Sequence, residues 1–347
     1  MRYQAGSVYL RPPSIHPTGR VTLHLHQLDW QRHEQPTLSA MTTTAEWCRV
    51  QLYNPTVVRV NGIYRMWYLG NSTATRTKDM DLGTATSVDG IHWEADPANP
   101  ILTARHLPAG ASWQTPHVLF DEGTERFRMW FVMSESSRDE SGQVLRLDQL
   151  PGYAESRDGL AWQVHPEPLL PSGRRPCVLP RSGGGFVMWM NSQPDAEHDS
   201  YKTIAQAVYR FESDDGLHWT RDAEPMLVPS GGLQTIVYPF VLQDGSDLTM
   251  WYGAHVEGGH FELFASTSTD GISWQHHHDR SAFPATRDPT RFDGRYTSTP
   301  CVVDGGGRWL LYYSARDLGS IYGTGDGQIG IDADGIYRHI GVATAEK

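Results

Sequence analysis

The chain has 347 residues, 12 of them tryptophan, and a formal net charge of −11 at pH 7. This acidic balance argues against nucleic acid and anionic membranes as partners, because both repel a negatively charged surface. No apolar run is long enough to cross a membrane, and the residues after Met1 lack the apolar core of a signal peptide. Cys48, Cys177 and Cys301 stand inside strand-like patterns, so we expect buried thiols and a cytoplasmic protein.

Residues 1–27 are predicted to form an N-terminal arm, and a repeat of about 60 residues follows it. Each repeat opens on Pro-x-Val and continues with an aromatic run such as Met66-Trp67-Tyr68. Four repeats then carry the phrase Ser-x-Asp-Gly-x-x-Trp, which begins at Ser87, Ser156, Ser213 and Ser268. Asp-Gly suits a two-residue hairpin turn, since glycine accepts a positive φ, and the tryptophan is expected to begin the next strand. Each repeat therefore predicts four antiparallel strands, as in a propeller blade.

The two ends of the chain look like halves of one repeat. The last repeat has no tryptophan strand, whereas Leu28-Asp29-Trp30 resembles Ile91-His92-Trp93 of the first repeat. Residues 28–40 are therefore expected to supply the outer strand of the last blade, which removes an exposed sheet edge. The prediction is a single all-β domain over residues 1–347: a five-bladed β-propeller, closed by its N-terminal strand, with blades that start near residues 46, 111, 171, 232 and 292.

A binding pocket is expected where the first strands begin and the second strands end. These positions differ between repeats, whereas the scaffold positions recur, so a unique site can be built there. They predict a substrate-binding set of Arg49, Asn54, Trp113, Gln114, Arg174, Arg175, Tyr238, Arg295, Tyr296 and Arg316. Several arginines on one face of an acidic protein suggest an anionic ligand such as a uronate or a sugar phosphate.

Four residues on the same face are candidates for acid–base catalysis: Asp293, Glu46, His255 and Glu135. His255 leaves a second strand and has a side chain that titrates near neutral pH. Glu135 begins a polar insertion, residues 135–150, which we expect to cover the pocket or to support a subunit contact. Neither the run His276–His278 nor the acidic residues Asp326, Asp332 and Asp334 have metal-ligand spacing, and no cofactor motif occurs, so no metal or cofactor is predicted.

The repeat resembles the five-bladed β-propeller glycosidases of glycoside hydrolase families 43 and 32 and the family 130 mannoside phosphorylases. The resemblance covers residues from about 28 to 345. In family 43 it would place catalytic carboxylates at positions that here hold Asn54, Thr115 and Arg174. The family 130 enzymes carry Asn-Pro at the first blade, as in Asn54-Pro55, but their proton-donating aspartate corresponds to Thr115.

Three hypotheses follow for the function. The first is a glycosidase-like enzyme with a non-standard catalytic set that acts on an anionic sugar or oligosaccharide. The second is a non-hydrolytic enzyme, such as a lyase, isomerase or cyclase, or an inverting glycoside phosphorylase. The third is a non-catalytic sugar-binding protein, because Trp113 could stack on a sugar in either an enzyme or a binding module.

Overall fold

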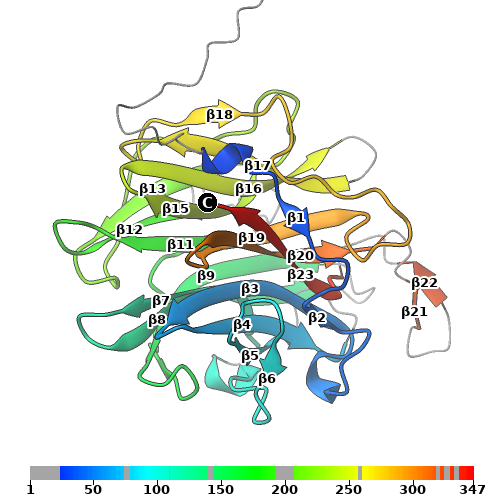
Figure 1. Cartoon of the computed structure of the whole chain (residues 1–347). Helices are drawn as coiled ribbons and strands as arrows, with labels where there is room; N and C mark the ends of the chain where they lie inside the picture. Colours follow the sequence, from blue (N-terminus) through cyan, green and yellow to red (C-terminus); the bar gives the residue numbers. More distant parts are fainter. Residues whose placement is uncertain are drawn as a thin grey trace, which may run out of the picture.

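In the computed structural model the regular secondary structure of the described residues is almost entirely antiparallel β-sheet (Figure 1). The structure describes residues 24–73, 79–108, 110–138, 144–192, 207–256, 260–317, 321–323, 329–331 and 336–347, without the side chains of 136–138, 144–147, 321–323 and 329–331. Three short 3-10 turns occur within these ranges: η1 (Leu25–Gln27), η2 (Glu46–Cys48) and η3 (Ala104–His106). None of the described helical segments has the length and apolar character that a membrane span requires. Asp326, Asp332 and Asp334 lie outside the described residues.

The strands form units that follow the sequence repeat. Unit 1 contains β3 (Gln51–Val60), β4 (Ile63–Asn71), β5 (Asp81–Ser87) and β6 (Glu94–Ala95). Unit 2 contains β7 (Ser112–Asp121), β8 (Arg126–Arg138), β9 (Val144–Ser156) and β10 (Gln163–Val164). Unit 3 contains β11 (Arg174–Pro180), β12 (Phe186–Asn191), β13 (Val208–Ser213) and β14 (Thr220–Arg221). Unit 4 contains β15 (Val237–Asp244), β16 (Asp247–Val256), β17 (His260–Ser268) and β18 (Gln275–His277). Unit 5 contains β19 (Tyr296–Asp304), β20 (Arg308–Arg316), β23 (His339–Glu346), β1 (Gln31–Arg32) and β2 (Leu38–Ser39).

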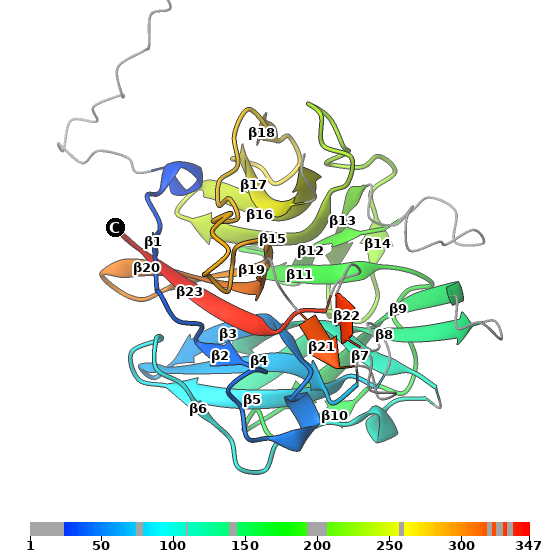
Figure 2. The same ribbon diagram turned by 90° about the vertical axis from the view of Figure 1, so that its right-hand side faces the viewer.

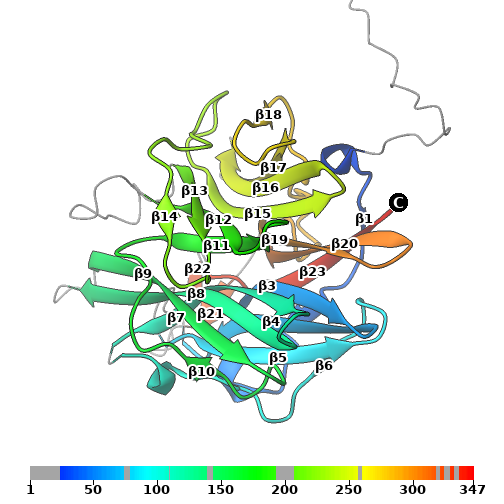
Figure 3. The same ribbon diagram turned by 90° about the vertical axis from the view of Figure 1, so that its left-hand side faces the viewer.

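The first strands of the units contact one another in cyclic order, from β3 through β7, β11, β15 and β19 back to β3. Figure 3 shows the units following one another around these first strands, from blue unit 1 to yellow unit 4. A separate hairpin pairs β21 (Ile321–Gly323) with β22 (Ile329–Ile331). Units 4 and 5 are joined into one sheet by a parallel bridge between Phe261 of β17 and Tyr296 of β19.

The N-terminal segment pairs with the last strand, as the sequence predicted. Gln31 of β1 lies opposite Thr344 of β23, and Leu38 of β2 lies opposite Ile340. Figure 2 shows the blue segment running along the red β23 strand. Arg32 also donates to the Asp293 carboxylate at 2.7 Å, so a buried ion pair fixes this segment to unit 5.

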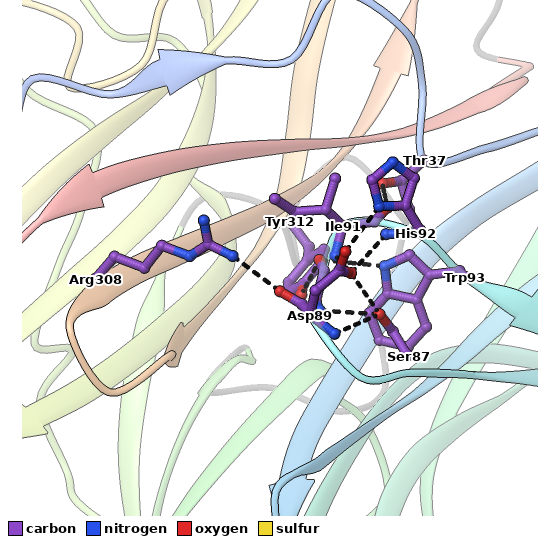
Figure 4. Close-up of polar contacts among 9 residues, drawn as sticks. Thr37, Ser87, Asp89, Ile91, His92, Trp93, Arg308 and Tyr312 are labelled. Carbon is purple, nitrogen blue, oxygen red and sulfur yellow. Dashed lines mark hydrogen bonds and ion pairs between the residues drawn. The ribbon is translucent and has the colours of Figure 1, made fainter.

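The repeated phrase forms a turn that its own side chains hold together (Figure 4). Ser87 Oγ accepts from the amide of Gly90, and Asp89 Oδ1 accepts from the amides of Ile91 and His92. Gly90 has a φ of +76°, which glycine adopts without a steric penalty. The prediction of a two-residue hairpin was wrong in detail, because the turn is longer and β6 begins one residue after Trp93.

These turns also bond to the neighbouring unit. The glycine carbonyl of one turn accepts a hydrogen bond from an aromatic side chain on the second strand of the unit before it. The pairs are Trp67 to Gly159 (2.9 Å), Trp130 to Gly216 (2.8 Å), Trp189 to Gly271 (3.2 Å) and Tyr312 to Gly90 (2.6 Å). Trp251 of unit 4 holds the same place in its repeat, but its buried Nε1 has no hydrogen-bond partner among the described residues. We call this interface, between units 4 and 5, the seam.

A second ring of bonds runs through the first strands and is interrupted at the same place. The residue after each first-strand proline reaches the backbone of the next unit. The pairs are Cys301 with Val57 (3.3 Å), Thr56 with Val118 (3.0 Å), His117 with Val178 (3.0 Å) and Cys177 with Val241 (3.1 Å). At the seam this position is Phe240, which has no polar side-chain atom. Cys48, Cys177 and Cys301 are all free and buried, as expected.

Candidate functional site

The first strand of every unit is bulged at the residue before its proline. A register shift occurs there in all five strands. The residues have left-handed φ angles: Asn54 (57°), Thr115 (40°), Arg175 (56°), Tyr238 (65°) and Thr299 (48°). Residues other than glycine seldom adopt this region, and strain of this kind tends to gather at functional sites. The shared bulge makes these positions structurally equivalent, and bulges commonly redirect a side chain.

Side chains of neighbouring strands hold the bulged amides. The amide of Asn54 donates to Ser314 Oγ at 2.8 Å, and the amide of Tyr238 donates to Asn191 Oδ1 at 3.1 Å. The amide of Arg175 donates to Thr115 Oγ1 at 3.2 Å. Each bond crosses from one unit to another, so the strained backbone is fixed by the assembled fold.

An aromatic row links units 1, 4 and 5 at this end of the first strands. Tyr53 stacks on Tyr337 with ring centroids 5.4 Å apart, and Tyr337 meets Tyr296 edge-on at 6.2 Å. Tyr296 stacks on Phe261 at 5.6 Å. The exposed ring of His255 packs edge-on against Phe261 at 4.9 Å and against Tyr296 at 6.0 Å. The predicted candidates His255 and Tyr296 are therefore neighbours.

Arginines cover the faces of these tyrosines. Arg316, only 1% exposed, lies 4.4 Å from the centroid of the Tyr296 ring. Arg174 lies 4.8 Å from the Tyr238 ring and donates to the Tyr238 hydroxyl. Guanidinium groups bind aromatic faces more strongly when water is excluded. We call Tyr53, Arg174, Tyr238, Tyr296, Arg316 and Tyr337 the arginine–tyrosine cluster.

Arg175 is completely buried. Its guanidinium donates to the carbonyl oxygens of Pro116 (3.4 Å) and Pro300 (3.0 Å), in units 2 and 5. Burial lowers the pKa of Arg175, because the charged form loses its hydration. Its position favours a role in joining the first strands, and direct ligand binding by Arg175 stays a prediction.

Two amide side chains at the site are buried with unused hydrogen-bonding groups. Asn54 is 1% exposed, and within the described part of the chain neither Oδ1 nor Nδ2 has a partner. Gln114 accepts from the Tyr53 hydroxyl at 2.9 Å, while its Nε2 has no described partner. A buried polar group without a hydrogen bond costs about 1–3 kcal/mol, so such groups call for an explanation. A polar ligand would supply the missing partners.

Asp293, the first carboxylate candidate, is enclosed by protein groups. Its oxygens accept from Arg32 and Arg291 and from the hydroxyls of Thr286 and Tyr313. Burial would raise the pKa of Asp293, but the bonds and charges of Arg291 and Arg32 outweigh it and lower the pKa. With four protein donors on a fully buried carboxylate, the contacts favour a structural role over catalysis.

Other predicted residues lie apart from the cluster. Glu46 and Arg49 pair with each other at 3.1 Å on exposed η2. Trp113 is fully buried, donates Nε1 to the Thr103 carbonyl and packs on Phe131, which favours a core role over sugar stacking. Glu135 lies opposite Asp148 in the β8–β9 hairpin. Arg295, by contrast, lies at the edge of the cluster, with its guanidinium 5.4 Å from the Tyr296 ring.

Sequence reasoning missed Tyr337 and Phe261. Both stand at the start of a third strand, or just before it. In an antiparallel sheet the third strand runs in the same direction as the first, so both begin at the same end. That geometry could have predicted that residues at the start of the third strands also line the site.

The structure also brings together Ser39, His339 and Asp317. Ser39 Oγ is 2.9 Å from His339 Nδ1, and His339 Nε2 is 3.7 Å from the Asp317 carboxylate. Ser39 is only 6% exposed and lies directly opposite His339 in the β2–β23 pair, and its Oγ also accepts from the Met41 amide. A nucleophile needs an approach to substrate, so these contacts favour a tie between two strands. Within the described residues, no group of three or more side chains could hold a metal ion.

Comparison with known proteins places the fold. No family model matches the chain. Two uncharacterized proteins of Mycobacterium tuberculosis, Rv1502 and MT1551, are each 26% identical over 145 residues, which is 42% of this chain and 46% of theirs. The chain thus matches about half the length of these curated relatives.

Solved structures match nearly the whole chain at low identity. One is of the GH130 family of mannoside phosphorylases, containing glycoside hydrolases that target beta-1,2 mannosidic linkages in Candida mannan (14% identity, TM-score 0.65, covering 92% of this chain and 96% of that one). Another is a thermostable family-43 glycoside hydrolase, with 15% identity and a TM-score of 0.57 over 85% of this chain and 96% of that one. A third is an N-acetylgalactosamine deacetylase from F. plautii in complex with blood group B trisaccharide. It has 17% identity and a TM-score of 0.65 over 91% of this chain and 95% of that one. The chain therefore shares the fold of these solved structures.

Proposed function

We propose that the chain is a single-domain, five-bladed β-propeller and a carbohydrate-active enzyme with a non-standard catalytic set. Its substrate is a polar, anionic sugar or sugar derivative bound at the arginine–tyrosine cluster. The cyclic contacts of β3, β7, β11, β15 and β19 support the five blades, and the pairing of β1 with β23 supports closure by the N-terminal strand. The free thiols support a reducing compartment, in keeping with a cytoplasmic protein.

One observation carries the functional proposal: the shared bulge before each proline. The bulge supports aligning Asn54 and Thr115 with the positions where family 43 enzymes have catalytic carboxylates. Arg174, aligned with the third carboxylate, stands just before the bulge of the third unit. Glycoside hydrolysis of the usual kind needs two carboxyl groups at a defined separation. An amide, a hydroxyl and a guanidinium cannot perform it, whereas a guanidinium fork suits a carboxylate or phosphate.

The remaining groups fit a sugar ligand. The unpartnered atoms of Asn54 and Gln114 would bond to sugar hydroxyls. His255 is exposed beside Tyr296 and is our candidate for proton transfer, whether in a hydrolytic or a non-hydrolytic reaction such as a lyase or isomerase step. Phosphorolysis is a second candidate, favoured by Asn54-Pro55 and the neighbouring arginines, because phosphate would then act as the nucleophile.

Ligand-induced thermal stabilisation tests the proposal, with inorganic phosphate, glucuronate, a hexose phosphate and neutral mannose as probes. Anionic probes should raise the melting temperature and neutral mannose should not. Arg174→Met should weaken anion binding about tenfold or more, the equivalent of about 1.4 kcal/mol. Arg49→Met, on the exposed η2 pair, is the matched control and should leave affinity unchanged.

A response to neutral sugars alone would overturn the anionic assignment. Once a turned-over substrate is found, His255→Ala should lower kcat by about 10²–10⁴ with little change in affinity, as expected for a general acid or base. Binding of anionic sugars without turnover of any of them would instead support the third hypothesis, a non-catalytic sugar-binding protein.

A further inference from the structure

A stack of histidines holds the segment before β1 against the outer strand of unit 4. The rings of His26 in η1 and His277 in β18 are nearly parallel, with an interplanar angle of 6° and centroids 3.9 Å apart. Behind them His276 stacks on His278 at 5.3 Å and 14°, and His24 lies 5.6 Å from His26. His24, His26 and His277 therefore meet where the N-terminal segment crosses unit 4, and His276 and His278 form a second pair on the opposite face of the outer strand.

This contact lies at the seam, where the two regular rings of inter-unit bonds are interrupted. η1 contacts β16 and β17, the two strands of unit 4 that lie inside β18. The indole of Trp251, on β16, finds no described acceptor here. Attachment of η1 thus depends on Leu25, which is buried, and on the histidine stack.

The imidazoles of His276, His277 and His278, in β18 and just after it, are held by hydroxyl groups. Tyr252 Oη lies 2.6 Å from His278 Nε2, Ser266 Oγ lies 2.9 Å from His276 Nδ1, and Thr267 Oγ1 lies 3.0 Å from His277 Nε2. These bonds keep the rings in place from the β-sheet side. His26 differs, because its buried Nδ1 has no described partner, so a proton added there gains no hydrogen bond.

Burial, together with nearby positive groups, disfavours protonation of the stack. Burial lowers the pKa of His26 to about 4, with further lowering by His277, His24 and Arg280, and Asp279 opposes the shift. Burial is also the largest cause of the lowered pKa of His276, His277 and His278. Two other carboxylates face the region, since Asp244 and Asp247 line a cavity of about 660 Å³ together with His24 and His26.

We propose that the His26–His277 stack is a pH-sensitive latch, which holds η1 on unit 4 when both rings are neutral and releases it when they are protonated. Two charged rings stacked face to face would repel each other, whereas two neutral rings attract. The released segment leads directly into β1, which borders β23 in unit 5. Acidification would therefore loosen the closure of the ring from its N-terminal side.

The direction of the effect follows from proton linkage. A released histidine titrates near its ordinary pKa of about 6.5. The held His26 titrates lower, so the released state binds more protons between these values. The latch is thus fully stable above about pH 6.5 and weakens as the pH falls toward about 4. The opening equilibrium should rise by up to about tenfold per pH unit for each proton taken up.

Hydrogen exchange measured by mass spectrometry on peptides covering residues 24–32 tests the latch between pH 4 and pH 8. Comparing wild type with His26→Phe at each pH removes the intrinsic pH dependence of exchange. Phenylalanine keeps the stacking and cannot be charged, so the wild type should exchange progressively faster than the variant as the pH falls. His218→Phe is the control, because His218 is an exposed residue that pairs with Asp215 in unit 3, away from the seam.

A second variant keeps the test decisive if His26→Phe disturbs η1. His277→Phe changes the other ring of the stack and should flatten the pH profile in the same way. The latch is overturned if wild type and both variants show the same pH profile in this segment. It is also overturned if wild-type protection at pH 4.5 equals that at pH 7.5.

Discussion

Four interfaces between the units share one pattern of bonds, and the seam differs from all of them. At the four regular interfaces an aromatic side chain of one unit donates to a turn carbonyl of the next. At the seam the turn is absent, and unit 5 is completed by a segment from the other end of the chain. The contacts of this closing segment are particular to it: the Arg32–Asp293 ion pair and the Ser39–His339 bond hold it within unit 5, and the His26–His277 stack holds it against unit 4. A repeat can therefore be closed by unique polar contacts where its own motif is missing.

The largest expected effect comes from removing Asp293, which attaches the closing N-terminal segment to unit 5. Asp293→Ala leaves Arg32 and Arg291 without their buried carboxylate. Removal of one partner from a fully buried ion pair costs about 3–5 kcal/mol, and the loss here should be at the lower end because both guanidinium groups are partly exposed. Urea unfolding should show this loss. A catalytic Asp293 would give the contrary result: an inactive variant with wild-type stability.

Asp293→Asn adds a pH control to this experiment. Because Arg291 and Arg32 lower the pKa of Asp293 in the fold, its charge stabilises the protein above the ordinary pKa of about 3.9 and ceases to do so as the pH falls. The asparagine variant should lose that part of the acid sensitivity. Wild-type acid sensitivity in the variant would contradict the assignment.

A smaller loss of stability is expected from an alanine substitution at the turn of a regular interface. At Gly159 (φ +72°) an added Cβ would lie 2.8 Å from the Trp67 ring, whereas at Gly62 (φ +81°) it would meet nothing within 4 Å. Both alanine variants carry the left-handed cost of about 1–2 kcal/mol. Gly159→Ala should lose about 1–3 kcal/mol more, as is usual for overpacking. Equal free energies of unfolding for the two variants would mean that the turn does not pack tightly on its neighbour.

The repeat made the sheets and the pairing of the two chain ends predictable from the sequence, because the aromatic runs and turn phrases recur at fixed positions. The candidate site was harder to predict from the sequence. Asp293 was a candidate for acid–base catalysis, and its partner Arg32 could not be anticipated because it lies 261 residues away in the sequence. Trp113 was expected at the pocket, but the bulge after Gln114 changes which side chains face which way, and alternation alone cannot reveal that. The types of residue at the first-strand starts and second-strand ends were nevertheless informative, since Arg174 lies against Tyr238, and Arg316 against Tyr296.

The smallest expected effect compares the same substitution at a regular interface and at the seam. Trp67→Phe and Trp251→Phe remove similar volume from buried sites in equivalent strands. Only Trp67 donates a hydrogen bond to the next unit, while Trp251 carries an unused buried donor. Trp67→Phe should therefore cost about 1 kcal/mol more than Trp251→Phe, the usual net value of one hydrogen bond. The difference is kept modest because the Gly159 carbonyl also accepts from Trp162 and stays bonded. If the two variants unfold at the same denaturant concentration, the hydrogen bond contributes nothing, and the seam would differ from the other interfaces in geometry alone.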